Sequence, residues 1–178
     1  MGQRLPQFWT RFDLEQARTA VDFEDLGQVA IRVLSRMEKN GLIVQICGPI
    51  TTGGLGSHKL NLARFQIAIE TLKADGYNVF DQMPFQSFMI KLLKLGHSGR
   101  ALLEDFYGLI FASSLIKFLF FLPLWETSIG AKWERQRVLM YRLPFADYPI
   151  GLLAMVESAK ALFQTSFFER KTYVQIEN

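Results

Sequence analysis

This 178-residue chain has few of the side chains on which disulfide scaffolds and metal sites depend. It contains one cysteine, Cys47, so no disulfide can form within the chain. His58 and His97 are the only histidines, too few with one cysteine for a typical zinc site, and we expect no metal or other cofactor. No signal-peptide pattern is seen at the start, and a lone cysteine suits a reducing compartment. We therefore expect a cytoplasmic protein.

The chain also lacks a large excess of charge of either sign. Twenty Lys and Arg residues stand against seventeen Asp and Glu residues, for a formal net charge of +3. This excess is too small to predict a nucleic-acid polymer or an anionic membrane as the main partner. Hydrophobic residues make up 49% of the chain and charged residues 21%, as in ordinary globular domains, so we expect one large core.

One long apolar run raises a membrane alternative. Residues 106–125 carry Lys117 as their only charge, and their length is about that of a membrane-spanning helix. Gly108, Ser113 and Pro123 interrupt the run, which divides into a helix-like half over 106–112 and a strand-like half over 116–122. We expect a buried helix that leads into a buried strand, with a transmembrane helix as the alternative.

The alternation of apolar segments predicts an α/β fold. An amphipathic helical pattern comes first and stops at Asn40-Gly41. Helical patterns then separate four short apolar runs, which predict strands at residues 42–47, 77–80, 116–122 and 143–145. Strands that alternate with helices imply right-handed crossovers and a mostly parallel sheet.

These patterns divide the chain into two parts. Residues 1–40 form a helical N-terminal extension, and residues 41–178 form the α/β domain. Within that domain we expect a late helix over 152–163, and an edge strand or partner-binding extension over 172–176. Cys47 ends the first predicted strand with no histidine beside it, which favours a packed thiol over a nucleophile.

Ligands of open parallel sheets bind outside the carboxyl ends of the strands, so the loops there are candidate sites. The first loop, residues 48–57, is glycine-rich, and its backbone amides suit a phosphate or sugar oxygen. It is not a P-loop, because Gly54 and Leu55 replace the required Lys and Ser or Thr, and no G-x-G-x-x-G is present. We interpret it as a ligand loop, with a simple turn as the alternative.

The loop after the third predicted strand leads into a helix. Ser128 is a suitable N-cap, and Gly130 lets a substrate approach the helix start, where free amides favour anions. Glu134 lies about one turn into this helix, where the helix dipole favours the ionised form that a nucleophile needs. The alternative is an exposed glutamate on a solvated basic face, formed by Lys132, Arg135, Arg137 and Arg142.

Three stretches of the chain together resemble the nucleoside 2-deoxyribosyltransferase-like superfamily. They are Cys47-Gly48-Pro49-Ile50-Thr51, the segment with Asn61, Phe65 and residues 74–80, and the loop Leu122-Pro-x-Trp-Glu-x-Ser-x-Gly-Ala-x-x-Glu134. The resemblance covers roughly residues 43–145 and is closest to a subgroup of small bacterial and phage proteins of unassigned function. The loop motif is fairly specific, whereas the Gly-Pro turn alone is weak.

The resemblance implies a flavodoxin-like, Rossmann-like fold and cleavage or transfer of the N-glycosidic bond of a nucleoside or nucleoside 5′-monophosphate. Glu134 matches the nucleophile, and Asp105, with Glu104 as a competitor, best matches an acid that assists the departing base. Ser128 stands where relatives that hydrolyse 5′-monophosphates carry serine, which favours hydrolysis. The resemblance also implies a homo-oligomer, and the expected substrate-binding residues are Gly48, Pro49, Ile50, Thr51, Thr52, Asn61, Trp125, Ser128 and Gly130.

Four departures from the family pattern support a second hypothesis. Gln45 replaces a frequent tyrosine, Leu124 replaces the loop glycine, and Lys117 stands where relatives place an acid. The stretch 105–123 is also about one helical turn longer than expected. The alternative is a catalytically inactive nucleotide-binding or sensing module on the same fold.

Overall fold

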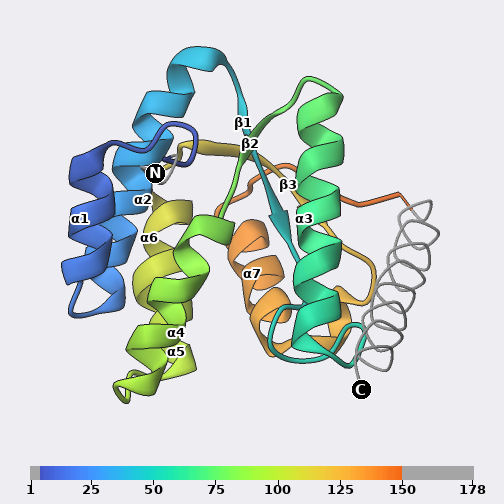
Figure 1. Ribbon diagram of the computed structural model, residues 1–178. Helices are drawn as coiled ribbons and strands as arrows, with labels where there is room; N and C mark the ends of the chain where they lie inside the picture. The colour runs from blue at the N-terminus through green and yellow to red at the C-terminus, as the bar shows by residue number, and fades with distance from the viewer. Residues whose placement is uncertain (1–4, 150–178) are drawn as a thin grey trace, which may run out of the picture.

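A four-stranded, fully parallel sheet forms the centre of the computed structural model, which describes residues 5–149 (Figure 1). The strands lie in the order β2-β1-β3-β4. Their bounds are Ile43–Cys47 for β1, Asn78–Phe80 for β2, Ile116–Phe121 for β3 and Phe145–Asp147 for β4. The predicted α/β, flavodoxin-like fold is confirmed.

Strand β1 is buried along its whole length, because helices cover both faces of the sheet. Val44 and Ile46 pack under α3 (His58–Ala74) on one face. Ile43 and Cys47 point to the other face, as alternation along a strand requires. That second face is covered by four helices, namely α2 (Phe23–Met37), α4 (Gln86–Lys94), α6 (Gly108–Ala112) and α7 (Ile129–Met140).

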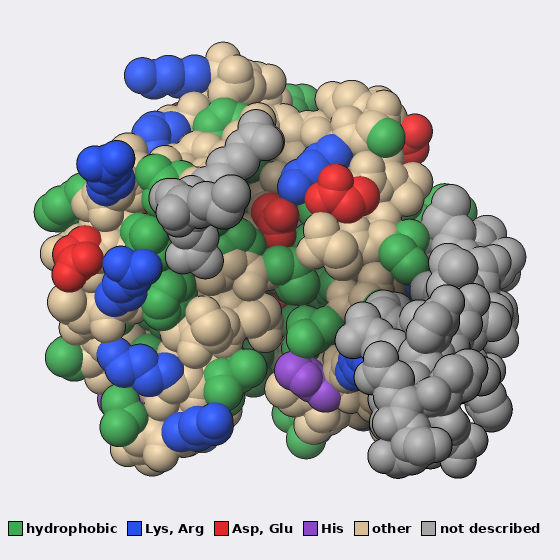
Figure 2. Space-filling view, viewed as in Figure 1, with side chains coloured by type: hydrophobic (Ala, Val, Ile, Leu, Met, Phe, Trp, Pro, Cys, Tyr) green, Lys and Arg blue, Asp and Glu red, His purple; other side chains and the backbone are tan. Residues whose placement is uncertain are grey.

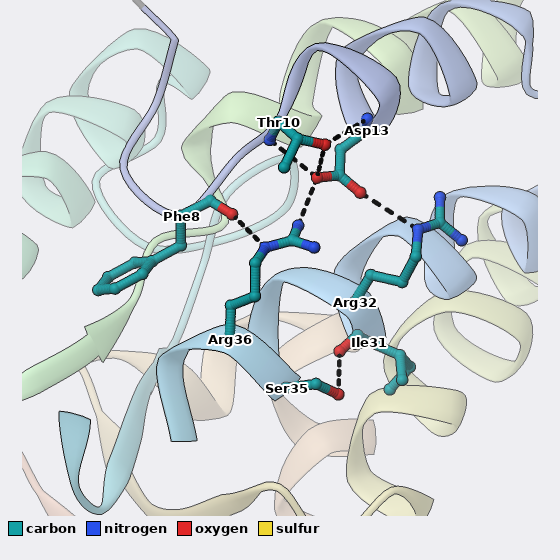
Figure 3. Close-up of polar contacts among 7 residues, drawn as sticks. All are labelled: Phe8, Thr10, Asp13, Ile31, Arg32, Ser35 and Arg36. Atoms are coloured by element: carbon teal, nitrogen blue, oxygen red, sulfur yellow. Dashed lines mark hydrogen bonds and ion pairs between the residues drawn. The ribbon is translucent and has the colours of Figure 1, made fainter. Parts of the chain in front are cut away.

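The N-terminal helices pack into the same core as the sheet. Helix α1 (Arg11–Thr19) lies on α2, and a short turn, η1 (Glu38–Asn40), leads into β1. Helix α2 buries Phe23, Leu26 and Val29 in the cluster that also contains residues of β1 and β3. A buried carboxylate, Asp13, joins α1 to α2 through two arginines of α2 (Figure 3).

The apolar run 106–125 is divided among several elements. After the single-turn α5 (Gly99–Ala101), a π-helical segment, η3 (Leu102–Tyr107), leads into α6, and β3 begins at Ile116. The predicted helix followed by a strand is thus present. Among the described residues, no helix is long and apolar enough to cross a membrane.

Other elements differ from the prediction in detail or lie beyond reach. The last strand begins two residues later than predicted, because Leu143 donates a hydrogen bond to the Val138 carbonyl (3.0 Å) and still belongs to the turn that ends α7. The helix predicted over 152–163 and the strand predicted over 172–176 lie outside the described residues.

On the face shown in Figure 2, lysine and arginine side chains are separated by neutral surface rather than gathered in one patch.

Candidate functional site

A cavity lies beside the carboxyl ends of β1 and β2 and beside the start of α7. It holds about 600 Å³ of empty space, part of which is open solvent. One part of its wall is apolar and comes from α4, η3 and α7, with side chains of Met89, Ile90, Leu93, Leu102, Leu103 and Ala131. The rest of the wall comes from Gly48, Ile50, Thr51, Gln82, Gln86, Tyr107, Ser128, Gly130 and Glu134.

Glu134 is buried in this wall. Its side chain follows Ala131 and precedes Val138 on the inward face of α7, and the residue is only 5% exposed. Its carboxyl group accepts hydrogen bonds from the Cys47 thiol and from the Gly48 amide at the end of β1. The alternative of an exposed glutamate on a solvated face is therefore wrong.

The ionisation of Glu134 also differs from the expectation. Burial raises the pKa of its carboxyl to about 8, and the hydrogen bonds from Cys47 and Gly48 offset only part of this effect. A helix dipole contributes about 1 kcal/mol, which is less than one pKa unit, whereas burial can shift a carboxyl by several units. The carboxyl is thus mostly protonated at pH 7, and the prediction that the helix start keeps it ionised is wrong.

Cys47 connects Glu134 to the sheet. The cysteine is buried, as expected for a packed thiol, and burial together with the charge of Glu134 raises its pKa well above the usual value. The thiol therefore stays protonated and donates to Glu134. Gln45 Nε2 lies 3.8 Å from the Cys47 sulfur. Gln45, which stands where the related family frequently has tyrosine, therefore belongs to the same hydrogen-bond network as Cys47 and Glu134.

Tyr107 is a cavity residue that the sequence interpretation missed. It is 5% exposed, and its pKa is raised well above the usual value by burial and by the charges of Glu134 and Cys47. Tyr107 ends the π-helical segment η3, whose wider turn changes which side chains face inward. In the sequence, the only sign of this π-helical segment was that the stretch 105–123 is about one helical turn longer than the family pattern predicts.

The two acids that the sequence offered as partners lie elsewhere. Asp105 is exposed and is not among the described residues that line the cavity. Glu104 forms an ion pair with Arg137 (2.6 Å) and accepts a hydrogen bond from Trp133 Nε1 (3.2 Å). The structure therefore does not bring either acid to Glu134.

The glycine-rich loop 48–57 is held in place by Asn61 from α3. Asn61 accepts a hydrogen bond from the Leu55 amide (2.9 Å) and donates to the carbonyls of Ile50 and Gly53 (both 3.1 Å). Gly53 has a positive φ of 66°, and a Cβ there would lie 2.3 Å from the Thr127 carbonyl oxygen. The loop therefore needs glycine at this position to pack against the loop before α7.

Ser128 joins the two loops at the mouth of the cavity. As predicted, it is the N-cap of α7, and its Oγ accepts from the Ala131 amide (3.3 Å). The same Oγ lies 3.4 Å from Thr52 Oγ1, which accepts from the Ile129 amide (3.3 Å). Backbone amides at the start of α7 thus surround this corner of the site.

The predicted substrate-binding residues fall into two groups. Gly48, Ile50, Thr51, Ser128 and Gly130 line the cavity together with Glu134. The other four are not among its described lining residues, namely Pro49, Thr52, Asn61 and Trp125.

Two arginines of the basic cluster, Arg135 and Arg137, are used in packing and ion pairs. The Arg135 guanidinium lies over the rings of Trp125 (4.6 Å) and Phe145 (4.2 Å) and pairs with Asp147 (2.6 Å). Trp125 therefore holds Arg135. Within residues 5–149, no group of three or more His, Cys, Asp or Glu side chains is placed to hold a metal ion.

Comparisons of the chain with protein-family models, with curated proteins and with solved structures found no match.

Proposed function

We propose that this chain binds a nucleoside or nucleoside 5′-monophosphate in the cavity and cleaves its N-glycosidic bond, with Glu134 as the nucleophile. The observation that carries the proposal is a single buried carboxyl in the wall of an open cavity, at the carboxyl ends of parallel strands, where such folds bind their ligands. A raised carboxyl pKa inside a cavity is typical of catalytic acids and bases. The sequence resemblance supports the same reaction.

In the proposed reaction, the ionised Glu134 attacks the anomeric carbon as the bond to the base breaks. The electron pair of that bond leaves with the base, which takes up a proton from water. Water or a second base then attacks the anomeric carbon, and the bond between the sugar and Glu134 breaks to regenerate the carboxylate. Tyr107 keeps its proton across neutral pH because its pKa is raised, so its hydroxyl remains a hydrogen-bond donor near Glu134. Asp105 has no role in this proposal.

The start of α7 suits the phosphate end of a nucleotide. Gly130 and Ser128 line the cavity there, and the positive end of the helix dipole favours an anion, although the amides of Ile129 and Ala131 already donate to Thr52 and Ser128. Thr51 lines the cavity from the loop opposite. This arrangement favours a 5′-monophosphate over a nucleoside, and the resemblance at Ser128 favours hydrolysis over base exchange.

Release of a free base tests the proposal. The full chain is incubated with a panel of nucleosides and 5′-monophosphates, and the products are separated by chromatography. We expect release of base from at least one monophosphate, and loss of that release in Glu134→Ala. The matched control is Glu126→Ala, which removes an exposed glutamate from the loop before α7 and should leave the rate unchanged. Full activity in Glu134→Ala contradicts the role of Glu134.

One observation favours the inactive binding module as the second candidate. Glu134 is the only carboxylate among the described lining residues, and it is mostly protonated at neutral pH. A protonated carboxyl in a cavity donates a hydrogen bond to a ligand and does not attack it. Calorimetric binding of a nucleotide without base release between pH 6 and 9 supports this candidate over the enzyme.

Assembly and location belong to the same proposal. Relatives in the proposed superfamily assemble into dimers or larger oligomers, so we expect this chain to form a homo-oligomer. The location that we propose is the cytoplasm, on the basis of the unpaired Cys47. Light scattering on the purified full chain gives the oligomer size.

A further inference from the structure

The cavity contains a polar group that no described residue satisfies. Gln82 lies two residues after β2, is 2% exposed, and lines the cavity. Its Oε1 is buried and accepts no hydrogen bond from residues 5–149. Buried carbonyl oxygens are nearly always paired in folded proteins, so an unpaired one on a residue of the cavity wall points to a ligand that brings a donor once the carboxamide turns toward the cavity.

The backbone around Gln82 is fixed on both sides. Asp81 forms an ion pair with Lys73 of α3 (3.0 Å) and accepts a hydrogen bond from the Met83 amide (3.0 Å). The Gln82 carbonyl accepts from the Phe85 amide (3.1 Å). These contacts anchor the backbone that carries the Gln82 side chain beside the cavity.

The surroundings of Gln82 suit a flat heterocycle. Met89 and Leu93 of α4 and Leu102 of η3 supply apolar wall against which a ring can lie. A carboxamide offers an acceptor and a donor side by side. The matching edge is an amino group beside an unprotonated ring nitrogen, and glutamine side chains read adenine in this way through N6 and N7.

We propose that Gln82 binds the edge of the substrate's base and selects an amino-bearing purine, adenine, with Oε1 accepting from the exocyclic amino group. This inference rests on the proposed function, because it places the base of the nucleotide in the same cavity as Glu134. It goes beyond that function by naming the base and the residue that selects it.

Binding of free bases to the full chain tests the inference without any cleavage. Calorimetry compares adenine with purine, which lacks the amino group, with N6,N6-dimethyladenine, whose amino group has no hydrogen, and with hypoxanthine, which has a carbonyl there. We expect adenine to bind at least tenfold more tightly than each of the other three. Equal binding of the four bases, or no binding of adenine, overturns the inference.

Two variants assign the preference to Gln82. Gln82→Met keeps the size of the side chain and removes both polar atoms, so the tenfold preference should disappear. Gln82→Glu keeps the shape but turns an oxygen toward the ring nitrogen, so adenine should bind at least tenfold more weakly. Gln66→Met, on the exposed face of α3, is the control and should keep the full preference. A preference that survives in both Gln82 variants overturns the assignment.

The outcomes separate this inference from the proposed function. Adenine binding that depends on Gln82, without base release from any nucleotide, removes the proposed reaction and leaves the base preference intact. Base release without a preference among the free bases removes the inference and leaves the reaction intact.

Discussion

Two carboxyl groups are buried within residues 5–149, and their surroundings favour the ionised form of one and the protonated form of the other. Asp13, fully buried between α1 and α2, accepts hydrogen bonds from Thr10 and pairs with Arg36 and, at 3.2 Å, with Arg32 (Figure 3). Among the described residues, Glu134 accepts hydrogen bonds from a thiol and one backbone amide. Burial alone therefore does not decide whether an acid is ionised. The number and the charge of its hydrogen-bond partners also set its pKa.

The pKa of Asp13 illustrates the balance. Burial raises it, but the hydrogen bonds from Thr10 and the charges of Arg32 and Arg36 together outweigh burial and lower the pKa below its usual value. Asp13 is thus an ionised structural group that holds two helices together. Glu134 lacks a cationic partner among its hydrogen-bond donors and faces a cavity, which is the environment of a group that changes its protonation during function.

The two carboxyls should respond to pH in opposite directions. The pKa of Asp13 is lowered in the fold, so its contribution to stability is present above the ordinary carboxyl pKa and is lost as the pH falls through the folded-state value. The pKa of Glu134 is raised from 4.5 to about 8, so the native state holds a proton that the unfolded chain releases over this range. Stability therefore falls as the pH rises from about 4.5 to 8.

The largest expected effect on stability is that of Glu134→Gln at high pH. The variant cannot ionise, so at pH 9 it should be more stable than the wild type by roughly 5 kcal/mol, and by less than about 1 kcal/mol at pH 5. Urea unfolding at both pH values measures the difference. Glu126→Gln, at an exposed position, should follow the wild type throughout. Parallel pH dependence of Glu134→Gln and wild type would show that Glu134 does not titrate as a buried group.

Asp13→Asn should change stability in the other direction. It removes a buried carboxylate and leaves two arginines that are each about a third exposed, so we expect a loss of roughly 2 to 3 kcal/mol at pH 7. Asp22→Asn is the matched control, because asparagine caps α2 as well as aspartate does. A loss below about 0.5 kcal/mol in Asp13→Asn would refute the structural role of its charge.

Cys47→Ala should increase the difference in pKa between Glu134 and Asp13. Without the thiol donor, the pKa of Glu134 should rise further above 8, by about one unit, whereas Cys47→Ser keeps a donor and should leave it nearly unchanged. Carboxyl carbon-13 NMR titration measures this shift, with Glu134→Gln identifying the signal. An unchanged titration in Cys47→Ala would mean that the thiol does not bond to the carboxyl.

The smallest expected effect compares the caps of two helices. Ser128→Ala removes the side chain that caps α7 and should cost about 1 kcal/mol in urea unfolding. Ser57→Ala stands at the start of α3, where the serine side chain makes no capping bond, and should cost less than about 0.5 kcal/mol. Equal losses in the two variants would argue against capping as the role of Ser128.

The sequence was sufficient for the sheet, because continuous apolar runs and the breaks between them are local signals. It also located Ser128, since an N-cap depends on neighbouring residues. The burial of Glu134 was not settled by neighbours, because Lys132, Arg135 and Arg137 suggest a solvated face. The spacing of Ala131, Glu134 and Val138 on one side of α7 was the signal available for it.

The remaining site residues depend on features that are not local. Tyr107 reaches the cavity because η3 is π-helical. The period of a regular α-helix predicts that other side chains of this stretch face inward. The raised pKa of Glu134 depends on Cys47 and Gly48 of a distant strand. Gln82 is a single polar residue in a short connection, and only its unpaired oxygen in the cavity wall distinguishes it.

The most direct test of the central claim is the rate of base release as a function of pH, for the wild type and for Glu134→Gln. If the ionised Glu134 is the nucleophile, the wild-type rate should rise about tenfold per pH unit below pH 8 and level off above it, and Glu134→Gln should release no base at any pH. A rate that falls as the pH rises through 8, or a Glu134→Gln variant as active as the wild type, would contradict the account.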